Sequence, residues 1–203
     1  NDLGPTYANN TTLDYWVFVV GAAPDNFFKL SPSNDAENQA TSLTLSWSAS
    51  VGEVAYAYCY DDSDDGACTN WVNVGTGTSA PINGLTPGAT YYWQVKAVNS
   101  YGETLADIGV YWSFTVGSAP GAFGKVSPLN GATGQPTNPT LSWGTSSGAT
   151  GYAYCYDQTD DDACTTWVST GTATSAGLSG LAYGGTYYWQ VKAVNTFGET
   201  LAD

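Results

Sequence analysis

The sequence predicts an all-β protein made of two tandem antiparallel β-sandwiches, the second of which lacks its last strand. The chain of 203 residues repeats itself without a gap at an offset of 96 residues, so that segment 91–99 recurs in identical form at 187–195. Segments in which apolar and polar residues alternate are separated by Gly, Pro, Asn and Asp, which is typical of strands joined by turns. Each repeat has the usual size of a single domain.

Composition indicates an extracellular protein, secreted or at the cell surface, and excludes two classes of partner. There are 4 basic and 18 acidic residues, for a formal net charge of −14, so nucleic acid and anionic membrane surfaces would repel the chain. No apolar run approaches the roughly 18 to 20 residues that a membrane-spanning helix needs, which argues against membrane insertion. The chain opens at Asn1 without Met, and we expect that a signal peptide has been removed.

Six strands can be assigned in the first repeat. Ser42–Trp47 alternates with period two, as does segment 56–60, whose tyrosines share one face while Cys59 lies on the other. The remaining segments are 71–74, 78–82, 85–97 and 110–116. All but the last recur in the second repeat, so pattern and spacing predict a complete sandwich followed by an incomplete one.

The four cysteines fall as one pair in each repeat, Cys59 with Cys68 and Cys155 with Cys164. Each pair would close a small hairpin. Zinc is the competing interpretation, but the chain has no His, and this spacing is not that of the known structural zinc sites. Two equivalent pairs in an acidic chain favour disulfides and an oxidising compartment.

One phrase of the sequence resembles the fibronectin type III domain. The pattern Leu85-x-Pro-Gly-x-x-Tyr-x-Trp-x-Val-x-Ala97 is similar to the start of the sixth strand of that family, and the strands at 42–47 and 56–60 are similar to its second and third. The resemblance covers nearly the whole chain from Tyr15 onward, although Tyr183 replaces the Pro in the second copy.

The resemblance implies a fold and two structural residues, but no function, because such modules serve as spacers, adhesins and receptors alike. It implies fibronectin type III-like sandwiches in which Tyr91 and Tyr187 are corner tyrosines, with hydroxyls that bond to the backbone at the sandwich edge. The disulfide hairpin is not general to that family; it is similar to tandem domains of secreted bacterial surface proteins.

The repeat also sets the domain boundaries. We assign residues 1–13 to a polar tail, 14–23 to a strand and its linker, 24–119 to the first domain and 120–203 to the incomplete second domain. The hexapeptide at 102–107 runs on into the last strand of the first domain, whereas its copy at 198–203 ends the sequence. A spare copy of the missing strand lies at the N-terminus, with no domain in front of it.

This arrangement predicts a fibre subunit that polymerises head to tail with copies of itself. The N-terminal donor strand would insert into the incomplete second domain of a neighbour. Both faces of that strand are apolar, which is an aggregation hazard unless the strand is always covered. The donor residues are Tyr15, Trp16, Val17, Phe18, Val19 and Val20, and the acceptor strand carries Tyr187, Trp189, Val191 and Ala193.

Three other interpretations stay open at this point. The chain could be a fragment of a longer tandem array, such as a surface adhesin. The strand could fold back onto its own second domain, although a linker of about four residues hardly allows this. A carbohydrate-binding module that recognises surface glycans is a further alternative, with Trp71 and Trp167 as a stacking platform. An enzyme is not expected, since there is no His and no paired carboxylates on rigid strand ends.

Weaker patterns suggest two kinds of modification or ligand. Acidic turns at the hairpin tips are candidates for calcium through Asp61, Asp65, Asp157 and Asp161, although the Glu expected at the twelfth position is replaced by Val72. The alternative is a solvated acidic turn. Overlapping sequons make Asn9 and Asn10 candidates for glycosylation. No other cofactor is expected.

The four lysines occupy equivalent places in the two repeats, Lys29 with Lys125 and Lys96 with Lys192. Some bacterial fibre domains carry Lys–Asn isopeptide bonds. Lys96 alternates outward from its strand, which argues against such a bond there.

Overall fold

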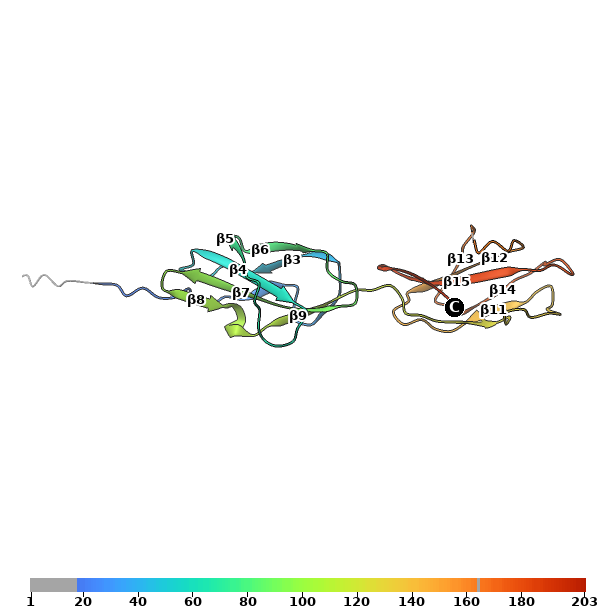
Figure 1. Ribbon diagram of the computed structural model, residues 1–203, viewed down its shortest axis with the longest axis horizontal. Coiled ribbons are helices and arrows are strands. Elements are labelled where there is room, and N and C mark those ends of the chain that lie inside the picture. Colours follow the sequence, from blue (N-terminus) through green and yellow to red (C-terminus); the bar gives the residue numbers. More distant parts are fainter. Residues whose placement is uncertain (1–17, 164) are drawn as a thin grey trace, which may run out of the picture.

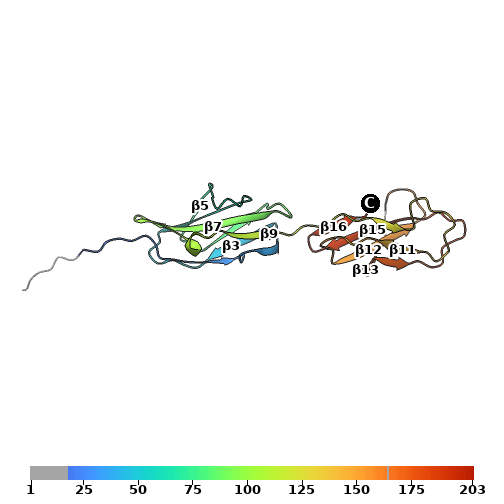
Figure 2. The same ribbon diagram turned by 90° about the horizontal axis from the view of Figure 1, so that it is seen from below.

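The computed structural model describes residues 18–163 and 165–203, which form two β-sandwiches arranged end to end along the long axis of the molecule (Figures 1 and 2). The fold is all-β, and apart from the pairing of one short strand the sheets are antiparallel. In the described part of the chain no helix is long and apolar enough to cross a membrane.

The first domain packs a three-stranded sheet against a six-stranded one. The smaller sheet has the order β1 (Lys29–Ser31), β3 (Ser42–Trp47) and β6 (Ser79–Asn83). The larger sheet has the order β2 (Ala36–Gln39), β9 (Trp112–Val116), β7 (Thr90–Asn99), β4 (Ala55–Asp61) and β5 (Val72–Gly75), and β8 (Gly102–Leu105) also pairs with β7. A 3-10 turn, η1 (Ala106–Gly109), leads from β8 towards β9.

The second domain has the same smaller sheet but a reduced larger one. The three-stranded sheet has the order β10 (Lys125–Ser127), β11 (Thr140–Trp143) and β14 (Ser175–Gly177). The four-stranded sheet has the order β13 (Val168–Gly171), β12 (Gly151–Asp157), β15 (Tyr188–Asn195) and β16 (Gly198–Leu201). Among the described residues, β2 and β9 have no counterpart in this domain.

Large aromatic side chains fill both cores. In the first domain Trp47, Tyr56, Trp93 and Phe114 are fully buried between the sheets, and in the second domain Trp143, Tyr152 and Val191 occupy the equivalent space. The period-two pattern of β3 and β11 thus places alternate residues in the core, as an amphipathic strand requires.

The six expected strands are present as β3, β4, β5, β6, β7 and β9. The largest boundary difference is in the strand predicted over 85–97, β7, which begins at Thr90 and not at Leu85, because Gly88 adopts a φ of 79° in a turn that precedes the strand. Strands β1, β2 and β8 were not predicted. They are three or four residues long and show no alternation from which they could be recognised.

Candidate functional site

The last strand of the first domain, β9, lies along one edge of β7. Its residues pair in antiparallel register, Thr90 with Thr115 at one end and Trp93 with Trp112 at the other. Strand β8 pairs with the remainder of the same edge, from Lys96 to Asn99. The edge of β7 is therefore shared by two strands and is covered along almost its whole length.

In the second domain only half of this edge is covered. Strand β16 pairs with β15 from Lys192 to Asn195, as β8 does with β7. Positions 186–189, which correspond to the part of β7 that pairs with β9, have no partner on this side among the described residues. We call residues 186–189 the open edge.

The side chains beside the open edge are more exposed than their first-domain equivalents. Trp93 is 0% exposed beneath β9, whereas Trp189 is only half-buried. Leu85 is buried and Leu181 half-buried, while Tyr188 is 40% exposed. Apolar surface that β9 covers in the first domain is thus partly open to solvent in the second.

Two of the four predicted acceptor residues border this vacancy and two do not. Tyr187 and Trp189 lie along the open edge. At Ala193 the edge is already paired with Thr200, and the carbonyl of Val191 accepts a hydrogen bond from Ala202 N. β16 and the residue that follows it thus cover the half of the edge at Val191 and Ala193, and the acceptor role of the four residues stays a prediction.

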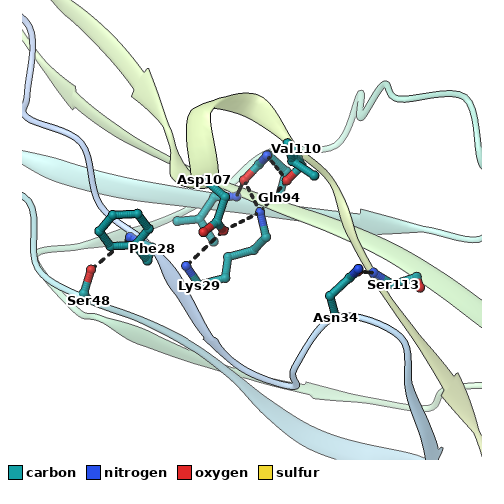
Figure 3. Close-up of polar contacts among 9 residues, drawn as sticks. Phe28, Lys29, Asn34, Ser48, Gln94, Asp107, Val110 and Ser113 are labelled. Carbon is teal, nitrogen blue, oxygen red and sulfur yellow. Dashed lines mark hydrogen bonds and ion pairs between the residues drawn. The ribbon is translucent and has the colours of Figure 1, made fainter.

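A buried lysine holds the residue that leads into β9 (Figure 3). Lys29 Nζ donates hydrogen bonds to the carbonyl oxygen of Val110 at 2.7 Å and to Gln94 Oε1 at 2.9 Å, and it forms an ion pair with Asp107 at 3.0 Å. Gln94 Nε2 donates to the same Val110 carbonyl at 2.9 Å. Burial lowers the pKa of Lys29, and the hydrogen bond and charge of Asp107 oppose that shift.

A turn at Asn34 and Asp35 holds β9 from its other side (Figure 3). Ser113 N donates to Asn34 Oδ1 at 2.9 Å, and Asp35 N donates to the Ser113 carbonyl at 2.8 Å. The Ser113 hydroxyl donates to Asp35 Oδ1 at 2.5 Å. Strand β2 follows directly and pairs in parallel with β9. In the second domain the corresponding segment forms no strand, since its partner strand is lacking there.

We call the buried lysine with its glutamine partner, Lys29 with Gln94 in the first domain, the lysine anchor. The same pair is present in the second domain. Lys125 Nζ donates to Gln190 Oε1 at 2.9 Å, and Asp203 N donates to the Phe123 carbonyl at 3.1 Å as Asp107 N does to Phe27. Nζ also donates to the Ala202 carbonyl at 3.2 Å, and burial lowers the Lys125 pKa while the charge of Asp203 raises it. Asp203 N thus occupies the place of Asp107 N, and the described residues contain no counterpart of the Val110 carbonyl.

The segment ahead of each domain is held by the same contacts. Asn195 Nδ2 donates to the Ser118 carbonyl at 2.9 Å, and Asn99 Nδ2 donates to the Ala22 carbonyl at 2.9 Å. Thr200 and Thr104 bind the carbonyls of the following prolines, Pro120 and Pro24, each at 2.5 Å. We call the segment ahead of the first domain, which contains Ala22 and Pro24, the leader. The leader therefore joins the first domain in the way that the interdomain linker joins the second.

The described part of the predicted donor strand extends away from the first domain, in the direction opposite to the second domain (Figure 1). Phe18, Val19 and Val20 are 85%, 90% and 78% exposed. The other predicted donor residues, Tyr15, Trp16 and Val17, lie outside the described residues. An exposed apolar segment of this kind is typical of a surface that binds a partner.

No local pattern in the sequence predicted the contacts of the last strand, which are Asn34, Asp35, Lys29 and Gln94. The only available signal was the equivalence of Lys29 and Lys125 in the two repeats. Their role depends on which backbone groups the fold brings to them, and this is not visible in a local pattern.

The first predicted disulfide is present. Cys59 is bonded to Cys68, with the Cα atoms 6.0 Å apart, across the hairpin between β4 and β5. Cys155 occupies the equivalent place in β12 and is not a free thiol. Its predicted partner Cys164 lies outside the described residues, so that pairing stays a prediction.

The acidic turns are not arranged as a metal site. Asp61 accepts a hydrogen bond from Ser63 N and Asp65 from Ala67 N, and their counterparts Asp157 and Asp161 do the same. These are Asx turns, in which one carboxylate oxygen is used by the local backbone. Within the described ranges no three carboxylates gather where they could hold an ion. The candidate glycosylation residues Asn9 and Asn10 lie outside the described residues.

The indoles considered as a sugar-stacking platform contact lysines instead. Lys96 Nζ lies 4.6 Å from the ring centre of Trp71, and Lys192 Nζ lies 4.5 Å from that of Trp167. Each lysine also pairs with a glutamate, at 2.8 and 2.7 Å. One ring face of each Trp is therefore covered, and Lys96 points away from the core, as the alternation predicts.

Both corner tyrosines make the bond that the resemblance implies. The Tyr91 hydroxyl accepts from Thr86 N at 3.1 Å, and the Tyr187 hydroxyl accepts from Ala182 N at 3.0 Å. Both domains are fibronectin type III-like β-sandwiches. Tyr187 keeps this corner bond although the strand beside it is missing.

Comparison with curated proteins finds one related sequence. Chitinase A1 from Niallia circulans is 36% identical over 172 residues, which are 80% of this chain and 23% of that protein. The chain thus spans about a quarter of the length of this relative. No protein-family model matches the sequence.

The solved structures that are similar to the chain include the following two. The FN1–FN3 domains of chicken CNTN1 are 20% identical, with a TM-score of 0.39, over 89% of this chain and 63% of that one. The structure of FN3tt mut is 22% identical, with a TM-score of 0.32, over 47% of this chain and 97% of that one.

Proposed function

We propose that the protein is a structural subunit of an extracellular filament, in which the N-terminal strand of one copy fills the open edge of the next. The observation that supports this most directly is the half-covered edge of β15 beside an assembled lysine anchor. The first domain presents the same edge and the same anchor with a strand in place. Residues 14–20 align with residues 110–116, which include that strand.

The inward-facing residues of the proposed donor strand are identical to those of β9. Trp16, Phe18 and Val20 correspond to Trp112, Phe114 and Val116, of which the last two are almost fully buried in the first core. The Asp14 carbonyl corresponds to that of Val110, and would accept hydrogen bonds from Lys125 and Gln190. Burying three large side chains contributes roughly 1.5 to 3 kcal/mol each, and the backbone ladder adds to this.

The leader supports assembly between copies over closure within one copy. Its contacts with Asn99 and Thr104 direct it away from the first domain at the pole opposite the second domain. To reach the open edge of its own chain, the strand would have to turn back along the full length of the first domain. A second copy placed head to tail needs no such turn.

The disulfide supports an extracellular location, because such bonds persist in oxidising compartments. We assign the protein no catalytic role. The proposed function needs only the strand, the open edge and the joints between domains.

A second candidate is a repeat array in which further residues of a longer chain would cover the open edge. The observation that favours it is the relative, Chitinase A1, in which the matching region is a minor part of a longer protein. In such an array each domain would receive its last strand from its own chain, as the first domain does here.

Two variants test the filament with the chain as it stands. Trp16→Asp with Phe18→Asp should abolish filaments in electron micrographs, because two charges cannot be buried unpaired in a core. The matched control is Leu30→Asp with Val126→Asp, which adds two charges at exposed, repeat-equivalent positions on the outer strands β1 and β10. This control should still polymerise.

A fusion tests the other end. Appending a copy of residues 108–116 after Asp203 supplies the missing strand at high effective concentration, so the product should be a stable monomer. Filaments that persist in this fusion, or in the Trp16→Asp, Phe18→Asp variant, would refute donor-strand exchange. A wild-type chain that stays monomeric would favour the repeat array.

A further inference from the structure

Positions 17 and 131 differ from their first-domain equivalents in a coordinated way. In the first domain three hydrogen bonds join Ser113 of β9 to the turn at Asn34 and Asp35, two of them to the Ser113 backbone and one to its hydroxyl. At the offset of 96 residues, Asn34 corresponds to Asn130 and Asp35 to Gly131. Ser113 corresponds to Val17 of the donor strand.

The two bonds to the strand backbone can form in the second domain as well. Asn130 keeps the acceptor amide, and Gly131 keeps a backbone N–H. Gly131 has a φ of 72°, close to the 59° of Asp35, so the turn has the same left-handed conformation in both domains. The hydrogen bond between the side chains cannot form, because both of its groups are missing. Gly131 lacks the carboxylate of Asp35, and Val17 lacks the hydroxyl of Ser113.

This matching is specific to one pair. The other outward-facing residue of β9, Thr115, bonds through its hydroxyl to Thr90 at 2.9 Å. Its counterpart in the donor strand is Val19, but Thr186 retains the hydroxyl of Thr90. Both polar residues of β9 are thus replaced by Val in the donor strand. Of their two side-chain partners, only Asp35 is lost in the second domain, where Gly131 takes its place.

We infer that Val17 and Gly131 form a specificity pair that directs the donor strand to the second domain of a neighbour and away from the first. This inference rests on the proposed function and identifies which of the two similar edges the strand selects. β9 fills the first domain from within its own chain, at high effective concentration, so a donor strand that resembled β9 in full could compete for that edge only while β9 is undocked. With Val at position 17, it would lose the hydrogen bond that the Ser113 hydroxyl makes to Asp35 Oδ1, and it would place methyl groups beside that exposed carboxylate, whose other oxygen accepts from Asn34 Nδ2 at 3.0 Å.

Gly131 removes that penalty in the second domain. There is open space where a side chain at this position would begin, and no residue other than the neighbours of Gly131 in the chain lies within 4 Å of that point. The methyl groups of Val17 would thus lie over backbone and meet no charge. If position 17 were Ser, its hydroxyl would meet no carboxylate in the second domain. It could not form the hydrogen bond that Ser113 makes to Asp35 in the first domain.

A double-mutant cycle tests the pair. The acceptor is the full chain carrying Trp16→Asp and Phe18→Asp, so that its own strand is disabled, either with Gly131 or with Gly131→Asp. Asp is compatible with this backbone, as Asp35 shows in the first domain. The probes are synthetic peptides of residues 11–21 with the native sequence, with Val17→Ser or with Val19→Thr, and binding is measured by calorimetry.

With Gly131, we expect the native peptide to bind more tightly than the Val17→Ser peptide by about fivefold, and with Gly131→Asp we expect the order to reverse by a similar factor. The Val19→Thr peptide is the control, and its affinity relative to the native peptide should be the same for both acceptors. A ratio of native to Val17→Ser affinity that is unchanged by Gly131→Asp would overturn the specificity pair alone. Absence of binding by every peptide would overturn the proposed function together with it.

Discussion

Lys29 Nζ lies 2.7 Å from the carbonyl oxygen of Val110, and this contact links the first strand of the first domain to the residue that leads into its last strand. The lysine is buried, and its charge is balanced by Asp107 at 3.0 Å. In the second domain Lys125 keeps its glutamine partner, Gln190, and within 18–163 and 165–203 no carbonyl takes the place of that of Val110. The same lysine–glutamine pair therefore lies beside a covered strand edge in the first domain and beside the open edge in the second.

The two lysines should respond differently to substitution. Lys29→Met should lower the free energy of unfolding by about 3 kcal/mol, because Asp107 would remain largely buried without its cation. Lys125→Met should cost about 1 kcal/mol or less in the free subunit, where the lysine is more exposed, yet it should weaken binding of the peptide of residues 11–21. Denaturant unfolding and peptide titration measure the two effects. Equal losses of stability, with unchanged peptide binding, would contradict an anchor role for Lys125.

The disulfides should stabilise each hairpin. Replacing Cys59 and Cys68 by Ala should reduce the free energy of unfolding by about 2.5 kcal/mol, the loop-entropy value for a closed loop of this size. Mass analysis without reductant should find Cys59 joined to Cys68 and Cys155 joined to Cys164. Four free thiols, or bridges between the repeats, would show that the pairing is wrong.

Calcium should have no effect on stability. Because Asp61 and Asp65 each give an oxygen to a local turn, a chelator should leave the melting temperature unchanged. The variant Asp61→Asn with Asp65→Asn should melt at nearly the same temperature, since the Asn carbonyl can accept the same backbone hydrogen bonds. A decrease in melting temperature on chelation that this variant lacks would reinstate a calcium site.

Stability should fall in alkali. Burial raises the pKa of Tyr56 and Tyr58, so above pH of about 10 the unfolded chain loses these protons before the folded protein does. Their contribution to stability is complete below pH 10 and is lost as the pH rises through the folded pKa values. Denaturant unfolding of Tyr58→Phe should show a shallower loss than the parent between pH 10 and 11.

The lowered pKa of Lys29 acts in the opposite direction, adding stability as the pH rises towards the unfolded lysine value. It is present in both proteins and cancels when Tyr58→Phe is compared with its parent. Identical slopes for the two proteins would mean that Tyr58 ionises equally easily in the folded and unfolded states.

The amino-acid sequence by itself determined the sandwich architecture and the cysteine pair of the first hairpin, while the corner tyrosines followed from the resemblance to the fibronectin type III domain. The architecture depends on period-two alternation in segments such as Ser42–Trp47, on the turn residues between them, and on a gapless repeat that shows most of the strands twice. A disulfide across a hairpin is local in the same sense, because its two cysteines are nine positions apart.

Only the tertiary structure decided how far the open edge extends and what surrounds it. The edge stops before Val191 because Ala202 returns to bond there, and β2 exists only where β9 is present to pair with it. Lys29 reaches Val110 across 81 positions of sequence, and the turn at Asn34 reaches Ser113 across 79. Such contacts form between strands that only the folded sandwich brings together, so no periodicity in the chain encodes them.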